Sequence, residues 1–141
     1  MNIATRIDTL VNDFKSFDNW EDKYKSIIEK GKTLPDFPEE HRLDQFKVKG
    51  CQSQVWLFPE LDGDKIKFHA DSDASIVKGI IAILLSVYSG ATPTEILATK
   101  PDFIDEIGLR QHLSMSRANG LNSMLKQISM YAIAFQHQLK S

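Results

Sequence analysis

The spacing of apolar side chains predicts two helices at the start of the chain. Residues on one face of a helix recur every three or four positions, and the first such stripe comprises Ile3, Ile7, Leu10, Val11 and Phe14. The second stripe comprises Trp20, Tyr24, Ile27 and Ile28. We expect Asp18 and Glu21 to cap the second helix and Gly31 to follow its last turn. Pro35 and Pro38 then predict an extended connector over residues 34–40.

Alternating apolar and polar residues predict strands in the middle of the chain, over residues 46–49, 54–58 and 65–68. Between the second and third of these, Asp62-Gly63-Asp64 is a hairpin-turn signal. We therefore expect a three-stranded antiparallel sheet in a meander. Cys51 would lie in the turn between its first two strands.

The rest of the chain is predicted to be helical. Residues 74–88 are apolar almost all round, which indicates a central, buried helix. Asp71-Ser72-Asp73 would supply its cap oxygen and an acidic charge at its N-terminus. Further helices are predicted after Thr92, over residues 102–107, and after Ser114 or Ser116. This order of elements predicts a single α+β domain over residues 1–141, with a three-stranded sheet packed against helices.

Composition and charge exclude several classes of protein. Apolar content of 42% and charged content of 26% are ordinary for a globular protein. A formal net charge of −2 gives no field that favours nucleic acid or an anionic membrane. No apolar stretch approaches the ~20 residues that span a bilayer, and the N-terminus lacks the apolar run of a secretory signal. The single cysteine excludes an internal disulfide and fits a reducing compartment, so we expect a cytoplasmic protein.

Cys51, which follows Gly50 and precedes Gln52-Ser53-Gln54, is the candidate reactive group, and four roles are open. It could be a structural core residue. A nucleophile for acyl transfer would need a histidine base, for which His69 and His112 are available without a local signature. A metal or iron–sulfur site needs three or four ligands, whereas the chain has one cysteine and four scattered histidines. Accepting and passing on sulfur needs one accessible thiol, a mobile loop and a docking surface.

The reactivity of this thiol should depend on where its loop lies. On an extended segment Lys47, Lys49 and Cys51 share a face, which places Lys49 about 7 Å from the sulfur. At the surface, such a charge would lower the pKa of the thiol by about half a unit. Desolvation against Val48 or Trp56 would raise it by a comparable amount.

The cysteine motif and the segments around it resemble the SufE family, in the same order and over nearly the whole chain. CsdE proteins share the pattern. The matching segments are Trp20-Glu21-Asp22-Lys23-Tyr24, Leu34-Pro35, Gly50-Cys51-Gln52-Ser53-Gln54-Val55-Trp56, Asp71-Ser72-Asp73-Ala74, Ile76-Val77-Lys78-Gly79, and His112-Leu113-Ser114-Met115-Ser116-Arg117 with Gly120-Leu121.

The resemblance implies a sulfur acceptor for a pyridoxal-phosphate cysteine desulfurase of the SufS or CsdA type. The pyridoxal phosphate would belong to the desulfurase, and this chain would need no cofactor. Cys51 would take the outer persulfide sulfur, stimulate the desulfurase and deliver the sulfur to a downstream acceptor or scaffold for iron–sulfur cluster assembly. The implied fold is a layered SufE/IscU-like α+β domain, and the additional cysteines of IscU-type scaffolds are missing here.

The resemblance also implies which residues support the cysteine loop: Gly50, Gln52, Ser53, Asp73 and Arg117. Asp73 and Arg117 have simpler interpretations, because Asp73 could cap the helix after it and Arg117 could simply occupy the first turn of the last helix. The family's cysteine rests in an apolar pocket and swings out when the desulfurase docks, which we expect here as well. A protein-interaction module with an incidental cysteine is the alternative.

Overall fold

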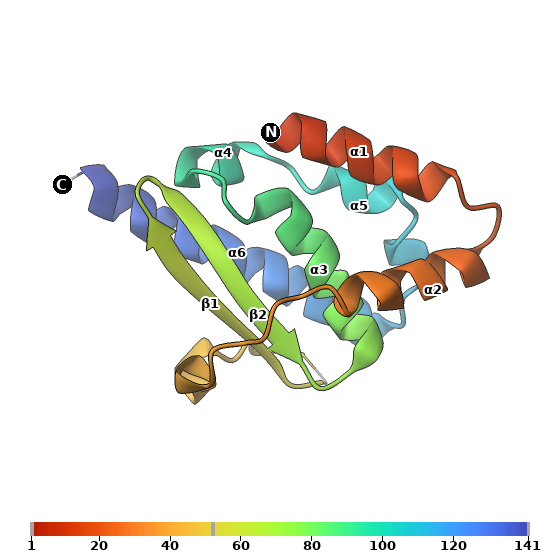
Figure 1. Cartoon of the computed structure of the whole chain (residues 1–141), viewed down its shortest axis with the longest axis horizontal. Coiled ribbons are helices and arrows are strands. Elements are labelled where there is room, and N and C mark those ends of the chain that lie inside the picture. Colours follow the sequence, from red (N-terminus) through yellow and green to blue (C-terminus); the bar gives the residue numbers. More distant parts are fainter. Residues whose placement is uncertain (1, 52, 141) are drawn as a thin grey trace.

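The structure of the chain, a computed structural model, describes residues 2–51 and 53–140. Figure 1 shows a hairpin of β1 (Val55–Asp62) and β2 (Lys65–Ser72) beside α3 (Ser75–Tyr88), with the long α6 (Met115–Lys140) behind them. This arrangement confirms an α+β fold. The remaining elements are α1 (Ile3–Lys15), α2 (Trp20–Gly31), α4 (Pro93–Ala98), α5 (Asp102–Glu106) and the single 3-10 turns η1 (Glu39–His41), η2 (Asp44–Phe46) and η3 (Arg110–His112).

The described residues form a sheet of two strands, so the expected third strand over residues 46–49 is wrong. That segment meets β1 only through an isolated bridge between Lys47 and Trp56, where the Val48 N–H donates to the carbonyl of Val55 at 2.8 Å. Pairing cannot extend backward because Phe46 belongs to the 3-10 turn η2. It cannot extend forward because Gly50 turns the chain away with a φ of +89°.

The hairpin itself follows the predicted turn. Asp62 pairs with Lys65 across a loop of Gly63 and Asp64, and Gly63 has a φ of +64°. A two-residue hairpin loop favours glycine because it requires positive φ. Both strands run further than their alternating patterns predicted, to Asp62 and Ser72, respectively. The hairpin therefore carries the chain from the Cys51 loop to its tip and back.

Both outer edges of the hairpin are covered or blunted. On the β1 edge, the hydroxyl of Tyr131 donates to the carbonyl of Leu57 at 3.4 Å. Pro59, which has no N–H, occupies the next position on the same edge. On the β2 edge, Ile66 N–H donates to Ala91 O at 2.9 Å, and the next outward N–H along β2 donates to a serine hydroxyl in the same 89–91 segment. These edges explain why no further strand joins the sheet within the described residues.

Helix α3 is the centre of the fold, as its apolar composition predicted. It crosses α2 at a place where two glycines bring the backbones together. A Cβ on Gly79 would collide with the carbonyl of Ile27, and a Cβ on Gly31 would lie 2.7 Å from the Gly79 nitrogen. Gly31 is thus the last residue of α2, with Lys32 as its C-cap, and the prediction that Gly31 follows the helix is wrong. The missing side chain serves close packing instead of a turn.

The helix starts agree with the sequence at α4 and differ at α2. At the predicted start of α4, Thr92 and Glu95 form a capping box, with Thr92 Oγ1 accepting from the Glu95 N–H at 3.2 Å. Helix α2 is capped by Asn19, which accepts from the Asp22 N–H at 2.9 Å, so the expected pair of Asp18 and Glu21 is displaced by one residue. Adjacent Asp and Asn side chains are equally good caps, and the sequence does not separate them.

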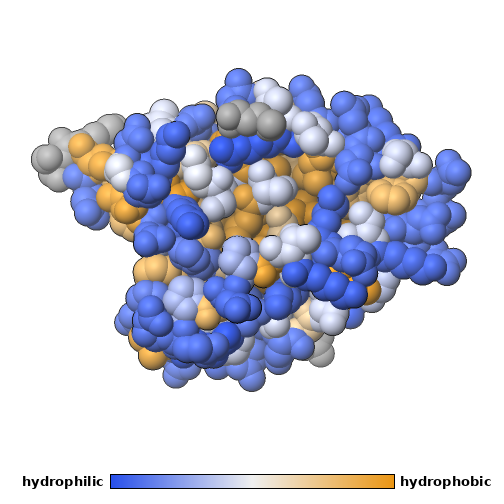
Figure 2. Space-filling view, in the orientation of Figure 1, coloured by the Kyte–Doolittle hydropathy of each residue, from blue (hydrophilic) through white to orange (hydrophobic). Residues whose placement is uncertain are grey.

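Polar side chains cover most of the face shown in Figure 2, and apolar side chains are visible in a shallow recess near its centre, over α3. The core beneath combines residues from both strands and from all six α-helices named above. Its largest fully buried side chains are Phe14, Phe103, Ile27, Ile66, Ile80, Ile81, Ile83, Leu84, Ile104, Ile107, Leu109 and Leu121. Within the described ranges, no helix combines the length and the apolar character that crossing a membrane requires.

Candidate functional site around Cys51

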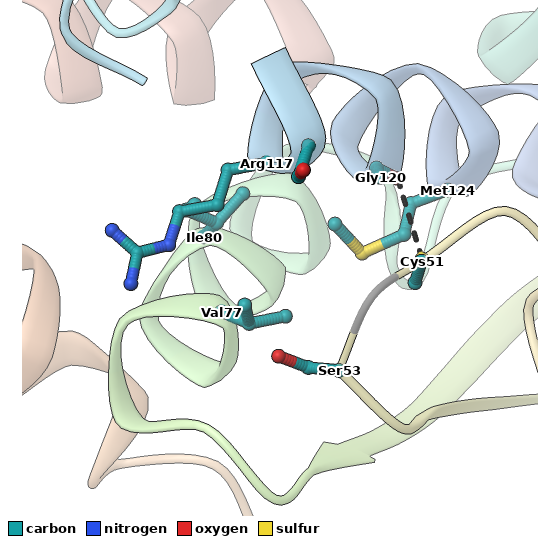
Figure 3. A pocket seen from close by; sticks show the side chains of 8 residues that line it. Cys51, Ser53, Val77, Ile80, Arg117, Gly120 and Met124 are labelled. Carbon is teal, nitrogen blue, oxygen red and sulfur yellow. Dashed lines mark hydrogen bonds between the residues drawn. The ribbon is translucent and has the colours of Figure 1, made fainter. Parts of the chain in front are cut away.

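Cys51 lies in the loop that the Lys47–Trp56 bridge closes, and this loop packs against the first turns of α6. Its side chain is partly buried, and its Sγ lies 3.7 Å from the carbonyl oxygen of Gly120, to which the thiol donates. Figure 3 shows this contact as a dashed line between the loop and α6. Gly50 precedes it with positive φ, so the chain turns immediately before the sulfur. The thiol is held against a helix by one weak hydrogen bond and by packing.

Gly120 gives the sulfur its place. A Cβ at Gly120 would lie 3.4 Å from Cys51 Sγ and 3.8 Å from its Cβ. A larger side chain at this position would therefore occupy the space of the thiol. In the sequence, Gly120 was singled out only as part of the family resemblance. A glycine inside a helical stripe is a signal of close approach, and that signal could have found it.

A pocket of about 90 Å³ adjoins the sulfur. Its walls come from the Cys51 loop, α3 and the first turns of α6 (Figure 3). On this measure a cavity needs only about 10–15 Å³ to hold one water, so the space next to the thiol exceeds what a single added sulfur atom needs. The pocket is lined by Cys51, Ser53, Val77, Ile80, Ser116, Arg117, Gly120 and Met124.

Burial raises the pKa of the Cys51 thiol above its ordinary value. We expected the lysines and desolvation to be comparable, but in this position of the loop desolvation dominates. Lys47 is turned elsewhere, with its Nζ 3.7 Å from a carboxylate oxygen of Asp44 and 5.6 Å from the centre of the Trp56 ring. Lys49 is exposed to solvent. The site as it stands keeps the sulfur protonated, which protects it from reaction.

Asp73 supports the loop and does not cap α3. Its Oδ1 accepts from the Gln54 N–H at 3.0 Å, and its own N–H donates to the Gln54 carbonyl at 3.3 Å. The N-cap of α3 is Ala74, which makes no side-chain cap bond, so the expected capping by residues 71–73 is wrong. A carboxylate that holds the chain directly after the cysteine motif restrains one end of that loop.

The other residues that the sequence assigned to the site have different positions. Ser53 and Arg117 line the pocket, but the guanidinium of Arg117 points away from Cys51 in Figure 3 and is exposed. Gly50 supplies the turn, and Gln52 lies outside the described residues. The structure adds three apolar side chains that the sequence analysis did not assign to the site. These are Val77 and Ile80 on α3 and Met124 on α6.

Acyl transfer gains no support from the histidines. His69 Nε2 is 2.9 Å from a carboxylate oxygen of Glu60, and His112 stacks on Trp20 with ring centres 4.1 Å apart. Neither histidine lines the pocket of Cys51. Within the described part of the chain, no three His, Cys, Asp or Glu side chains are grouped so that they could hold a metal ion. The chemistry available at the pocket is that of the thiol itself.

Comparison with known proteins assigns the chain to a family. The SufE model, described as an Fe-S metabolism associated domain, matches residues 8–132. The chain belongs to the SufE family. A SufE-like protein of Rhizobium meliloti is 45% identical over 135 residues, covering 91% of this chain and 95% of the relative. The sulfur acceptor protein CsdE of Escherichia coli is 40% identical over 123 residues, covering 86% of this chain and 84% of CsdE.

A solved structure shows the same fold. The solution structure of a hypothetical protein from Thermus thermophilus superposes with a TM-score of 0.79, covering 94% of this chain and 96% of that one. Its sequence is only 21% identical, so it bears on the fold alone. The candidate site is therefore the single cysteine of a SufE domain, which lies in a loop beside a small pocket.

Proposed function

We propose that this SufE-family protein accepts sulfur on Cys51 from a cysteine desulfurase of the SufS or CsdA type. The observation that carries the proposal is the pocket of about 90 Å³ beside a single, partly buried thiol on a loop. It gives a transferred sulfur a recess directly beside the thiol. The relative named a sulfur acceptor, CsdE, supports the same function.

The reaction needs no redox cofactor in this chain. The Cys51 thiolate attacks the outer sulfur of a cysteine persulfide on the desulfurase. A new S–S bond forms to Cys51 while the S–S bond of the donor breaks, and the donor cysteine leaves as a thiolate that takes up the proton released by Cys51. The pyridoxal phosphate that generates the donor persulfide belongs to the desulfurase. Delivery to a downstream acceptor, including a scaffold for iron–sulfur clusters, repeats the same exchange with Cys51 as the donor.

The resting geometry makes this transfer depend on movement of the loop. Gly120 O accepts a hydrogen bond from the thiol, and burial raises the pKa of the thiol, so both features disfavour the thiolate that must attack. Moving the sulfur out of the pocket removes both effects at once. The hinge for this movement is Gly50, and Asp73 holds the chain beyond the motif in place. Docking of the desulfurase therefore activates Cys51 by exposing it.

Mass spectrometry tests the proposal directly. We expect incubation with a desulfurase and free cysteine to add about 32 Da, the mass of one sulfur, to the peptide that contains Cys51. Cys51→Ser, which keeps size and polarity close to those of the thiol, should gain no mass yet still bind the desulfurase. Omission of free cysteine is the second control, because no donor persulfide then forms.

The same experiment separates the proposal from its alternative. Suppose that the wild type binds the desulfurase but gains no sulfur, and that Cys51→Ser stimulates turnover as strongly as the wild type does. The chain is then an interaction module with an incidental cysteine. A sulfur adduct that is absent from Cys51 would also reject the proposal. If Cys51→Ser loses both the sulfur adduct and the stimulation of turnover, then acceptance of sulfur by Cys51 is the step that speeds the desulfurase.

A further inference from the structure

A second, larger depression borders the Cys51 loop, where Lys49 lines it. It lies between the segment of residues 44–49 and α6, with a volume of about 600 Å³. We call it the lysine groove. Gly50 separates Lys49 of the groove from Cys51 of the thiol pocket, and a Cβ added at Gly50 would lie 2.7 Å from the hydroxyl of Ser123 in the groove wall. The lysine groove is lined by Asp44, Gln45, Lys47, Lys49, Ser123, Lys126, Gln127 and Met130.

The α6 wall of the lysine groove is a stripe that the core does not use. Its members are spaced three and four residues apart, as on one face of a helix: Ser123, Lys126, Gln127 and Met130. The buried face of α6 is formed by other positions, among them Leu121, Met124 and Ile128. Met130 is 52% exposed, and Ile133 extends the same side of the helix with 50% exposure. The groove thus ends in an apolar surface that solvent reaches.

Charge in the lysine groove is opposite to that of the chain as a whole. The chain carries a net −2, whereas the groove gathers three lysines and one aspartate. Asp44 lies 3.7 Å from Lys47. Lys49 and Lys126 are exposed, and neither forms an ion pair with any residue that the structure describes. Two such cations on opposite walls complement an acidic ligand that lies between them.

We infer that the lysine groove docks an acidic polypeptide segment of the protein that exchanges sulfur with Cys51, with an apolar side chain of that segment on Met130. The inference rests on the proposed function and names the chemistry of the partner. Lys49 lies two residues before Cys51 in the sequence, and Lys47 lies four before it. A segment bound here therefore brings the sulfur-carrying group of the partner close to the thiol. Carboxylates of the segment would pair with Lys49 and Lys126. Exposed ion pairs of this kind steer the association of two proteins and fix the orientation of the bound segment.

A nucleic acid fits the lysine groove less well than a peptide. Single strands bind through basic tracks together with aromatic side chains on which bases stack. The groove has three lysines, no aromatic lining residue among those described, and Asp44 at its rim with a 98% exposed side chain. Met130 instead offers contact to an aliphatic side chain. These features favour a polypeptide that combines acidic and apolar residues.

Binding of a defined peptide tests the inference on the full chain. The probe is a fluorescein-labelled, glutamate-rich peptide with leucine at every fourth position, followed by fluorescence anisotropy. We expect the double variant Lys49→Glu/Lys126→Glu to bind it about tenfold more weakly than the wild type, because two attractions become repulsions. The matched control is Lys15→Glu/Lys100→Glu, which changes the net charge equally at two exposed lysines outside the groove and should bind as the wild type does.

A second measurement ties the groove to sulfur exchange. The Lys49→Glu/Lys126→Glu variant should require about tenfold more protein for half-maximal desulfurase turnover, with the same maximal persulfide on Cys51. Equal peptide binding by both double variants, or an unchanged half-maximal concentration, would overturn the inference. Tighter groove binding of an oligothymidylate of matched charge, or binding of inorganic phosphate that displaces the peptide, would overturn it as well. Failure of the wild type to form any persulfide rejects only the proposed function and leaves the peptide result intact.

Discussion

The carbonyl oxygen of Gly120 and the Sγ of Cys51 lie 3.7 Å apart, with no side chain between them. One residue thus supplies the hydrogen-bond acceptor for the thiol and the space that the thiol occupies. Both contributions favour the neutral, sheltered sulfur. The resting state of the site is defined by this contact between a loop residue and a helix backbone.

Substitution of Gly120 should change the state of the sulfur in a size-dependent way. Gly120→Leu would fill the place of the thiol, so we expect Cys51 to be displaced and alkylated faster than in the wild type. Gly120→Ala is the matched control, because its Cβ makes ordinary contact at 3.4 Å and alanine stabilises a helix by up to about 1 kcal/mol relative to glycine. Rates of reaction with iodoacetamide measure the difference. Equal rates in all three proteins would contradict this account of the pocket.

The pH dependence of Cys51 follows from its burial. Burial raises the pKa of the folded thiol, so the unfolded chain loses this proton at a lower pH than the folded chain does. The contribution of Cys51 to stability is therefore complete below the ordinary thiol pKa of about 8.5 and declines as pH rises through the folded value. We expect the free energy of unfolding, measured in urea, to fall over this range.

Cys51→Ala provides the control for that decline. Two tyrosines also titrate in the alkaline range, because burial raises the pKa of Tyr88 to about 12 and that of Tyr131 above its usual value. Both remain in the variant. The difference between wild type and Cys51→Ala isolates the thiol, and a difference that is constant from neutral to alkaline pH would show that burial does not shift its pKa.

Asp73 should affect the loop through one hydrogen bond. Asp73→Ala leaves the Gln54 N–H without its 3.0 Å acceptor, and we expect it to cost about 1 kcal/mol of stability and to speed alkylation of Cys51. Asp73→Asn keeps an acceptor oxygen at the same position and should retain most of the wild-type behaviour. Urea denaturation and iodoacetamide kinetics check both variants. Loss of equal size in both would point to the charge of Asp73 and away from the hydrogen bond.

The crossing of α2 and α3 should not tolerate a side chain at Gly79. Gly79→Ala places a Cβ against the backbone of Ile27, which cannot rotate away as a side chain could. We expect a loss of about 1–3 kcal/mol, as for other overpacked cores, although alanine is the better helix former. Gly120→Ala is again the comparison, since it makes the same chemical change in a helix with room for it. Thermal unfolding of the two variants should move in opposite directions.

Much of this fold could be predicted from local sequence patterns. The stripes of α1 and α2, the continuous apolar run of α3 and the capping box at Thr92 are short-range signals, and each marks the element that forms. The third strand was predicted from a pattern of the same kind and did not form. Alternation over four residues indicates an extended segment, but pairing also depends on the residues that flank it. Here the 3-10 turn η2 comes before the segment, and Gly50 turns the chain away after it.

The candidate site was predictable only in part, for the same physical reason. Cys51 stood out because it is the single cysteine and follows a glycine. Its environment is formed by Met124 and Gly120, about 70 residues away along the chain, and by Val77 on α3. Contacts of that separation leave no periodic trace in the sequence. Without these contacts, the sequence could not show whether lysine charge or desolvation dominates the pKa of the thiol.

The covered edges of the hairpin limit how another protein can recognise this one. Ala91 and Ser89 occupy outward-facing backbone groups of β2, while Tyr131 and Pro59 close off β1. An incoming strand would find few main-chain donors and acceptors to continue the ladder. A partner must then recognise this protein through its side chains, where a single substitution can change which partner binds without changing the fold.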